Sequence, residues 1–200
     1  MKKQPKKRRT ISERTKKSLI YSAVIVGVIL VSLLIAFGVN ALITAIEKND
    51  CPHPYSDVVK KYSEKYEVDE NLIYAVIRVE SNFDAKAESE KGAIGLMQIM
   101  PVAYKDYCID TGEDYDVSML KDPETNIRVG TYLLARLYRY YGNWDTVLAA
   151  YNAGIGTVSE WLRDERYSSG DGILFEIPYR QTKLYVEKVN RYKGVYDILY

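Results

Sequence analysis

The chain has 200 residues, a formal net charge of +1, two cysteines and one histidine. That histidine, His53, leaves Ser-His-Asp and Cys-His mechanisms without their base unless it folds back into a distant cleft. The HExxH zinc pattern, clustered cysteine ligands, the GxxxxGK[ST] loop and a strand-linked GxGxxG are absent from the sequence. We therefore expect neither a metal nor a cofactor, and carboxylate chemistry remains.

The N-terminal part has the composition of a membrane anchor. Residues 1–17 form a basic arm with nine Lys and Arg against one acid, and residues 18–46 are uncharged and rich in Val, Ile, Leu and Ala. Such a run is long enough to cross a bilayer as a tilted helix. The positive-inside rule then predicts a single-pass protein of the cell membrane, with the arm in the cytoplasm and the rest outside.

Two other interpretations of this part are weaker. A secretory signal peptide has the same polarity, but its apolar core is shorter and ends at a small-x-small cleavage site, and FGVNALITAIEKND offers no persuasive one. The basic arm could bind nucleic acid, but the apolar run directly after it makes orientation in the membrane the simpler explanation. We therefore expect an uncleaved anchor and no nucleic-acid partner.

The remainder is an acidic outer domain, because 26 acidic and 19 basic residues follow the arm. Residues 47–56, with two prolines, are predicted to form a linker, and residues 57–200 have the size of one compact domain. Cys51 and Cys108 lie on the predicted outer side, where a disulfide could tie the linker to the domain. The sequence slightly favours the disulfide over two unpaired thiols.

Helical spacing of apolar residues predicts a domain that is mostly α-helix, folded from near Tyr55. Asp69 is a good N-cap for the first clear helix. Val68 and Ile73 are placed for a hydrophobic staple around this cap. The apolar stripe of the helix consists of Leu72, Ile73, Val76 and Ile77.

Capping residues predict the later helices. A loop over residues 83–95 leads to Pro101, which suits the first turn of a helix to about Ile109. Asp122 and Pro123 begin a longer helix that Gly142 ends. Further segments are a helix from Asn143 or Asp145, interrupted by Gly154 and Gly156, a short TVSEWL segment over residues 157–162, and a final helix over 181–199.

Glu80 continues the apolar stripe at spacings of seven, four and three from Ile73, Val76 and Ile77. A carboxyl group on that face is partly desolvated, which raises its pKa and lets it donate a proton near neutral pH. The alternative is a helix-end glutamate paired with Arg78 or Lys86.

Three motifs decide between these alternatives. ESNFDAKAESEKGAIGLMQIMP at 80–101, AAYNAGIGTV at 149–158 and IPYRQTKLYVEKV at 177–189 resemble, in this order and spacing, the lytic transglycosylase family with an SLT-type, lysozyme-like domain. The resemblance spans about residues 57–193. It implies an all-α fold of the goose-lysozyme/SLT type behind one N-terminal transmembrane helix.

The resemblance also implies an activity. The family cleaves the β-1,4 bond between N-acetylmuramic acid and N-acetylglucosamine in peptidoglycan, and Glu80 matches its catalytic acid. This acid protonates the bridging oxygen and then, as a base, takes the proton of the sugar's own C6 hydroxyl, which attacks C1. The product is a 1,6-anhydromuropeptide. Ordinary glycosidases need two carboxylates, whereas here the substrate supplies the nucleophile.

Six further residues match sugar-binding positions of the family. Ser89 matches a serine that contacts the reacting sugar, and Tyr151 a tyrosine near the catalytic glutamate. Gln98 and Met100 match residues that line the cleft, and Asn152 supports the turn of the AYN motif. Gln181 falls where the family commonly has glutamate, and Gln181, Thr182 and Lys183 replace its Glu-Thr-Arg. This difference removes a charge from that end of the cleft.

Two alternatives remain. A muramidase of goose-lysozyme type would share the fold and the acid but use water, and the loss of a second carboxylate at Gln181 disfavours it slightly. A membrane-tethered peptidoglycan-binding or assembly protein would keep the cleft without turnover. In all three cases the expected partners are peptidoglycan glycan strands and, through residues 18–46, the membrane. The sequence does not identify a secretion, sporulation or other cell-wall machinery.

Overall fold

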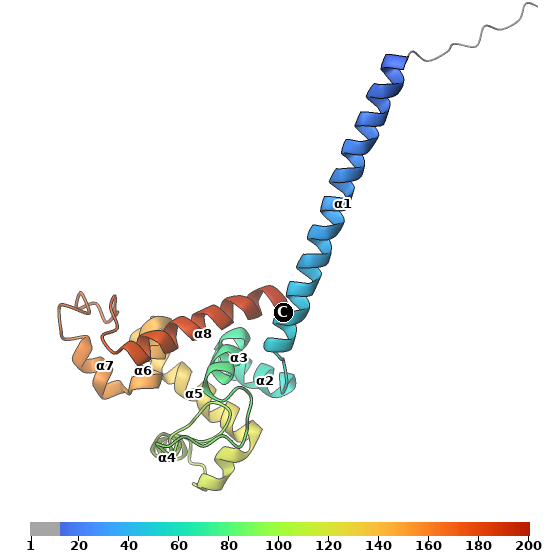
Figure 1. Cartoon of the computed structure of the whole chain (residues 1–200). Helices are drawn as coiled ribbons and strands as arrows, with labels where there is room; N and C mark the ends of the chain where they lie inside the picture. Colours follow the sequence, from blue (N-terminus) through green and yellow to red (C-terminus); the bar gives the residue numbers. More distant parts are fainter. Residues whose placement is uncertain (1–12) are drawn as a thin grey trace, which may run out of the picture. The chain divides into compact units, whose positions relative to one another are not determined.

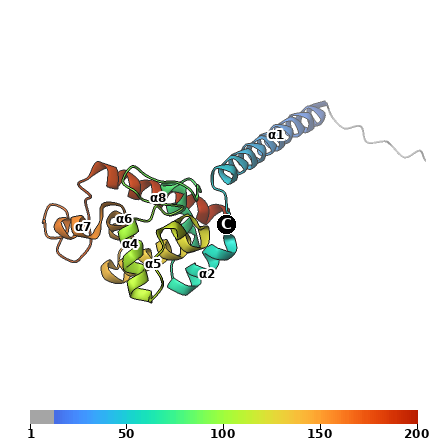
Figure 2. The same cartoon turned by 90° about the horizontal axis from the view of Figure 1, so that it is seen from below.

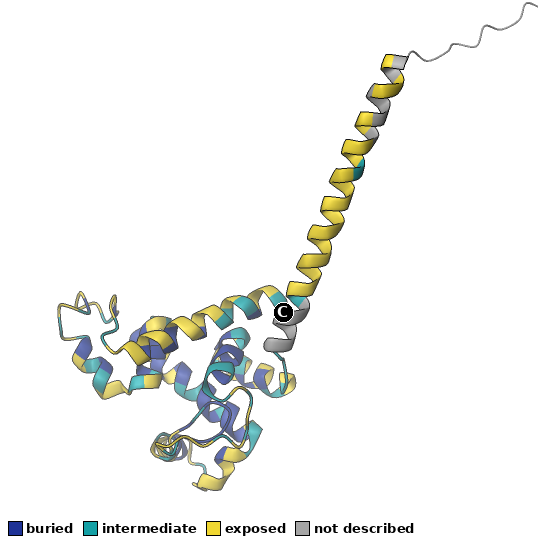
Figure 3. Ribbon diagram, in the orientation of Figure 1, coloured by how far each residue is buried: buried dark blue, intermediate teal, exposed yellow. Residues whose placement is uncertain are grey.

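The computed structural model describes residues 13–200 and divides into two units, residues 1–50 and 51–200, which we describe separately. In the first unit a single helix, α1 (Glu13–Asp50), contains the segment Val24–Thr44, which is long and apolar enough to cross a membrane. The apolar side chains described in this segment are exposed (Figure 3). α1 extends to Asp50, so the first part of the expected linker is helical. Residues 1–12 of the predicted arm lie outside the described residues.

The second unit is mostly α-helical, as predicted, and apart from helices and loops its described residues contain only three isolated β-bridges (Figures 1 and 2). Its elements are α2 (Ser56–Tyr66), α3 (Glu70–Glu80), α4 (Pro101–Thr111), the 3-10 helix η1 (Val117–Lys121), α5 (Pro123–Tyr141), α6 (Trp144–Ala153), α7 (Ile155–Trp161) and α8 (Arg180–Leu199). α3 packs along α8, and α2 packs along α5. α6 contacts both α5 and α8, which closes the arrangement.

The predicted caps are present. The side chains of Asp69, Asp122 and Asn143 accept hydrogen bonds from the backbone N–H groups of Leu72, Thr125 and Thr146, at 3.0, 2.8 and 3.0 Å. Gly142 ends α5 in the left-handed conformation, which a residue without Cβ adopts at little cost. These local signals explain why the boundaries of α3, α5 and α6 could be read from the sequence.

One boundary differs from expectation. Gly154 joins α6 to α7 at a φ of +91°, but α7 begins at the next residue, so Gly156 lies inside a helix. A single glycine with positive φ is therefore sufficient for the change of direction. The predicted TVSEWL segment covers the central and C-terminal part of α7 and its C-cap residue, Leu162.

The expected disulfide is absent: Cys51 and Cys108 are both buried thiols. The Cys108 thiol, on α4, donates to the Asp114 carbonyl at 3.7 Å, within the loop that follows its own helix. Cys51 lies instead against the end of α8, where its carbonyl accepts a hydrogen bond from the Tyr200 hydroxyl at 3.2 Å. The two cysteines are thus held by different neighbours.

Residues 51–54, which we expected to be linker, are bound to the domain. The Tyr74 and Tyr196 hydroxyls donate to the Pro54 and Pro52 carbonyls at 3.1 and 2.9 Å. His53 stacks on Tyr74 and Tyr200, with ring centroids 3.9 and 4.2 Å apart. Burial lowers the pKa of His53, an effect that Glu70 partly offsets. The folded unit therefore starts at residue 51, and His53 is engaged in packing.

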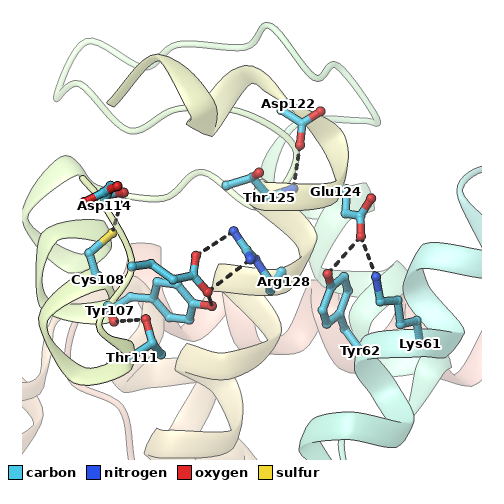
Figure 4. A network of polar contacts seen from close by, with 11 residues as sticks. Lys61, Tyr62, Tyr107, Cys108, Thr111, Asp114, Asp122, Glu124, Thr125 and Arg128 are labelled. Carbon is cyan, nitrogen blue, oxygen red and sulfur yellow. Dashed lines mark hydrogen bonds and ion pairs between the residues drawn. The ribbon is translucent and has the colours of Figure 1, made fainter. Parts of the chain in front are cut away.

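A polar network connects α2 and α4 to α5 (Figure 4). The Glu124 carboxylate accepts hydrogen bonds from Lys61 and Tyr62 of α2, at 2.7 and 2.9 Å. Arg128, one turn further along α5, pairs with Glu113 at 2.9 Å, and the Tyr107 hydroxyl donates to the same carboxylate at 2.7 Å. This network is made of residues that do not line the cavity described below, so we assign it to the stability of the fold.

The capping of α5 gives a first testable expectation. Asp122→Ala removes the acceptor for the Thr125 N–H group and should lower the free energy of unfolding of a fragment spanning residues 51–200 by about 1 kcal/mol. Chemical denaturation measures this difference. Glu64→Ala, on the exposed face of α2, is the control and should change stability by less than about 0.5 kcal/mol. Equal effects of the two substitutions would contradict the assigned cap.

Candidate active site

One cavity of about 810 Å³ brings together the whole set of residues that the sequence singled out. Its walls come from the end of α3, the turn at 89–93, the loop at 98–100, the end of α6 and the start of α8. The seven expected residues that line it are Glu80, Ser89, Gln98, Met100, Tyr151, Asn152 and Gln181. Segments up to about a hundred residues apart in sequence therefore form one site.

Glu80 is the last residue of α3 and lies partly buried at the cavity. The stripe that leads to it, Ile73, Val76 and Ile77, is fully buried, as the spacing predicted. Burial raises the pKa of the Glu80 carboxyl to about 7, because the anion loses solvation. At neutral pH both the acid and the carboxylate are thus populated, which suits a group that must donate and then accept a proton.

Tyr185, on α8, is a second member of this centre that the sequence analysis missed. Its buried hydroxyl interacts with the Glu80 carboxyl and partly offsets the rise of the Glu80 pKa. The approach falls short of a well-formed hydrogen bond, and the hydroxyl has no better partner among the described residues. Tyr185 lies one helical turn after Gln181, which lines the cavity, and this spacing was the available signal.

Tyr151 is another group close to Glu80. It comes from α6, and its hydroxyl donates to the Met97 carbonyl at 2.8 Å. Burial and the nearby Glu80 charge both raise the pKa of Tyr151 well above its usual value, so the hydroxyl stays protonated. The phenol is thereby bound to the 94–99 loop, close to the Glu80 carboxyl.

Gln98 has a strained backbone, with a φ of +49° that non-glycine residues rarely adopt. Its side-chain Nε2 donates to the carbonyls of Ala87 and Gly95 at 3.3 and 3.1 Å. Both amide hydrogens are therefore used within the protein. What Gln98 can offer a ligand in the cavity is its amide oxygen, an acceptor.

Other predicted residues are tied to the backbone around them. The Ser89 hydroxyl oxygen accepts the Ala93 N–H at 2.9 Å, which leaves its hydrogen to donate. The Asn152 amide oxygen accepts a hydrogen bond from the Thr182 hydroxyl at 3.0 Å, which connects α6 to the start of α8. Met100 is 39% exposed and offers an apolar surface.

The cavity also contains a carboxylate that the sequence analysis did not consider. Gln181 carries no charge, but Glu90, exposed on the 89–93 turn, lines the same cavity, as do the basic residues Lys91 and Arg180. Lys183 is not part of the lining and pairs with Glu176 at 3.0 Å. The rim is therefore charged, whereas the buried centre contains one carboxyl.

A smaller cavity of about 290 Å³ adjoins this one and shares Gln98, Met100 and Tyr151 with it. Its other walls are largely apolar side chains of α4, α5 and α7, including Val102, Leu133 and Ile155. Among the described residues, no group of three or more His, Cys, Asp or Glu side chains is placed to hold a metal ion.

The helical fold and the cavity around Glu80 can now be compared with those of known proteins. Residues 57–173 match the model of the Transglycosylase SLT domain, and the chain belongs to this family. It is 38% identical over 152 residues to the soluble lytic murein transglycosylase of Escherichia coli K12, covering 72% of this chain and 23% of that protein. It is 36% identical over 161 residues to the membrane-bound lytic murein transglycosylase C of Edwardsiella ictaluri, covering 69% and 45%.

Solved structures agree. The 70-kDa soluble lytic transglycosylase in complex with bulgecin A superposes with a TM-score of 0.69 at 34% identity, over 76% of this chain and 25% of that one. An inactive Glu-to-Gln mutant of the Slt transglycosylase of Pseudomonas aeruginosa gives 0.66 at 32% identity, over 74% and 24%. The predicted SLT-type, lysozyme-like fold is confirmed. The chain spans about a quarter of the length of these soluble relatives.

The raised pKa of Glu80 predicts a pH-dependent effect on stability. The folded protein binds more protons than the unfolded one between the ordinary pKa of 4.5 and about 7, so Glu80 favours folding below this window and loses that contribution as the pH rises through it. Glu80→Gln should therefore gain stability relative to the wild type from about pH 4 to pH 8, by on the order of 3 kcal/mol.

Denaturation of the 51–200 fragment at several pH values measures this gain. Glu90→Gln, which removes an exposed carboxyl from the rim of the same cavity, controls for the change of charge. A pH-independent difference between Glu80→Gln and the wild type would mean that the Glu80 carboxyl is not desolvated.

Proposed function

We propose that this protein is a peptidoglycan lytic transglycosylase that cleaves the β-1,4 bond between N-acetylmuramic acid and N-acetylglucosamine with formation of a 1,6-anhydro product. The observation that carries the proposal is one partly buried carboxyl, Glu80, with a pKa of about 7 in a cavity bordered by Gln98 and Tyr151. Family membership and relatives named lytic murein transglycosylases support it.

In the first step Glu80 acts as an acid. Its protonated carboxyl donates to the bridging oxygen while the bond from that oxygen to C1 of the muramoyl residue breaks. The leaving sugar departs as an alcohol, and positive charge develops at C1. The Glu80 carboxylate that results lies close to this charge, and the Tyr185 hydroxyl favours the anion.

In the second step Glu80 acts as a base. The C6 hydroxyl oxygen of the same muramoyl residue bonds to C1, and its proton moves to the Glu80 carboxylate. The acid is regenerated, no water is consumed, and a 1,6-anhydro ring closes. Because the substrate supplies the nucleophile, the buried centre needs one carboxyl and no cofactor.

The remaining residues are proposed to hold the sugars. Gln98 accepts a hydrogen bond from an amide or hydroxyl of the substrate, and Ser89 donates one to the reacting sugar. Tyr151 limits the position of Glu80, and Met100 offers an apolar wall between the two cavities. Asn152 supports the turn next to Tyr151, and Gln181 contacts the substrate at the start of α8 without adding charge.

A muramidase that uses water is the second candidate, and Glu90 is the observation that favours it. A carboxylate in the same cavity as the acid could activate a water molecule, as in two-carboxylate glycosidases. Glu90 is exposed on a turn, whereas Glu80 is partly buried, so the transglycosylase is preferred. A protein that binds peptidoglycan without turnover is the third candidate.

We also propose the location. α1 would span the cell membrane once, with the basic arm in the cytoplasm and the domain at 51–200 outside, where peptidoglycan strands lie. The apolar Val24–Thr44 segment and a membrane-bound relative support anchoring, and the charge asymmetry across residues 1–46 supports the direction.

The activity is tested with the 51–200 fragment, which forms a compact unit with its own core. Incubated with purified peptidoglycan, it should release anhydromuropeptides that mass spectrometry detects one water lighter than the corresponding hydrolysis products. Glu80→Gln should lower the rate by at least about a hundredfold, since the general acid is lost, while sugar binding persists.

The outcomes separate the three candidates. Products with a reducing end, lost in Glu90→Gln as well as in Glu80→Gln, would identify a hydrolytic muramidase. Binding of peptidoglycan without any product would identify the binding protein. Glu90→Gln is the matched control for the transglycosylase and should retain most of the activity, because it changes an exposed carboxyl of the same cavity.

The orientation is tested in intact cells that express the full chain. A membrane-impermeant amine reagent should label lysines beyond residue 46 and leave those of residues 1–17 unlabelled until the membrane is permeabilised. The opposite pattern, or equal labelling of both parts in intact cells, would exclude the proposed topology. Peptide mapping by mass spectrometry identifies the labelled lysines.

A further inference from the structure

The loop that carries Gln98 is bound by one side chain of α5, that of Asn126. Asn126 is 1% exposed, and its amide oxygen accepts the Met97 N–H at 2.8 Å. Its Nδ2 donates to the carbonyls of Ile94 and Leu120 at 2.9 and 2.7 Å. All three hydrogen bonds are buried, so the carboxamide is bound on every side by backbone.

Two glycines let the loop approach α5 this closely. A Cβ at Gly95 would collide with the Asn126 carboxamide and with the Leu120 carbonyl. A Cβ at Gly130, one turn after Asn126 on α5, would collide with the Met97 side chain. Met97 therefore packs directly on the α5 backbone, and the loop has little freedom to shift.

The same loop contacts the surroundings of Glu80 from two directions. The hydroxyl of Ser81, the residue after Glu80, donates to the Leu96 carbonyl at 2.8 Å. The Tyr151 hydroxyl donates to the next carbonyl, that of Met97, also at 2.8 Å. Consecutive loop carbonyls thus hold the end of α3 and the phenol beside Glu80, while Gln98 follows in the cavity wall.

We propose that Asn126 is a positioning residue of the active site: it fixes residues 94–97, whose Leu96 and Met97 carbonyls hold Ser81 and Tyr151 around Glu80. Asn126 does not line either cavity, so it acts only through the loop. The catalytic meaning of this inference rests on the proposed function, whereas the coupling between Asn126, the loop and Glu80 does not.

The chemistry of the contact explains why an asparagine occupies this position. The site requires one acceptor and two donors on one short planar group, which is what a carboxamide provides. An aspartate would accept from Met97 but would face two carbonyls without donors. An apolar residue would leave the buried Met97 N–H and the Leu120 carbonyl without these partners, each at a cost of about 1–3 kcal/mol unless the loop moves to find water. The Ile94 carbonyl would keep only the hydrogen bond from the Ile99 N–H, at 2.9 Å.

The test combines Asn126→Ala with Tyr151→Phe in the 51–200 fragment. Alone, Asn126→Ala should lower kcat on peptidoglycan by on the order of tenfold to a hundredfold with little change in KM, because the loop carbonyls shift. In the Tyr151→Phe background the same substitution should cost less, since one of the two contacts through which it acts is already gone and only that of Ser81 with the Leu96 carbonyl remains.

Thr131→Ala is the matched structural control. Thr131 is also fully buried on α5, and its hydroxyl bonds only to the Ile127 carbonyl of its own helix, at 2.7 Å. This variant should lose stability, as Asn126→Ala does, but keep kcat within about twofold of the wild type. Gly130→Ala displaces Met97 from the other side and should reproduce the kcat loss, and it replaces Asn126→Ala if that variant does not fold.

A second readout does not depend on turnover. The pKa of the Glu80 carboxyl, followed by carbon NMR, should fall in Asn126→Ala as the displaced loop admits water, and should stay unchanged in Thr131→Ala. Effects of Asn126→Ala and Tyr151→Phe that add in full, or an unchanged Glu80 pKa in Asn126→Ala, would overturn the inference. A fragment without any activity but with the expected fall of the pKa would overturn the proposed function alone.

Discussion

The desolvation of the Glu80 carboxyl is the constraint on which the rest of the site depends. α3 is buried along most of its length, from Leu72 to Ile77, and Glu80 lies where this buried helix reaches the cavity. Burial leaves the carboxylate anion only partly solvated, and this raises the pKa of Glu80 to about 7. At neutral pH the protonated and the ionised forms are therefore both present. Tyr185, on α8, partly offsets the rise of the Glu80 pKa, and the 94–99 loop binds the next residue, Ser81, through the Leu96 carbonyl.

Much of the fold could be predicted because its boundaries are set locally. Asp69, Asp122 and Asn143 each accept a hydrogen bond within their own first turn, so a sequence pattern contains the whole interaction. The position of Glu80 on a buried stripe could be predicted for the same reason, because the stripe lies within one helix. The seven candidate residues line one cavity. They could be predicted as one site because the family resemblance supplied long-range information that periodicity does not contain.

What could not be predicted depends on contacts between distant segments. Tyr185 lies 105 residues after Glu80, and its spacing from Gln181 could suggest a place near the cavity but not contact with a carboxyl. Two of the three backbone partners of Asn126, at Ile94 and Met97, belong to a loop about 30 residues earlier in the chain. The expected disulfide failed for the same reason: proximity in space, which decides bonding, cannot be read from two cysteine positions. Residues 51–54 were predicted to be linker because their two prolines are typical of linkers, whereas their hydrogen bonds with Tyr74 and Tyr196 leave no mark in the local sequence.

The burial that suits Glu80 to its proposed role also opposes folding at neutral pH, because the unfolded chain solvates the carboxylate better than the folded one does. The domain must therefore hold this centre in place with interactions that are independent of the charge of Glu80. The carboxamide of Asn126 and the hydroxyls of Ser81 and Tyr151 are neutral groups that bond to backbone carbonyls or N–H groups. A frame of neutral hydrogen bonds keeps the same geometry when Glu80 loses and regains its proton, which a frame of ion pairs to that carboxyl would not.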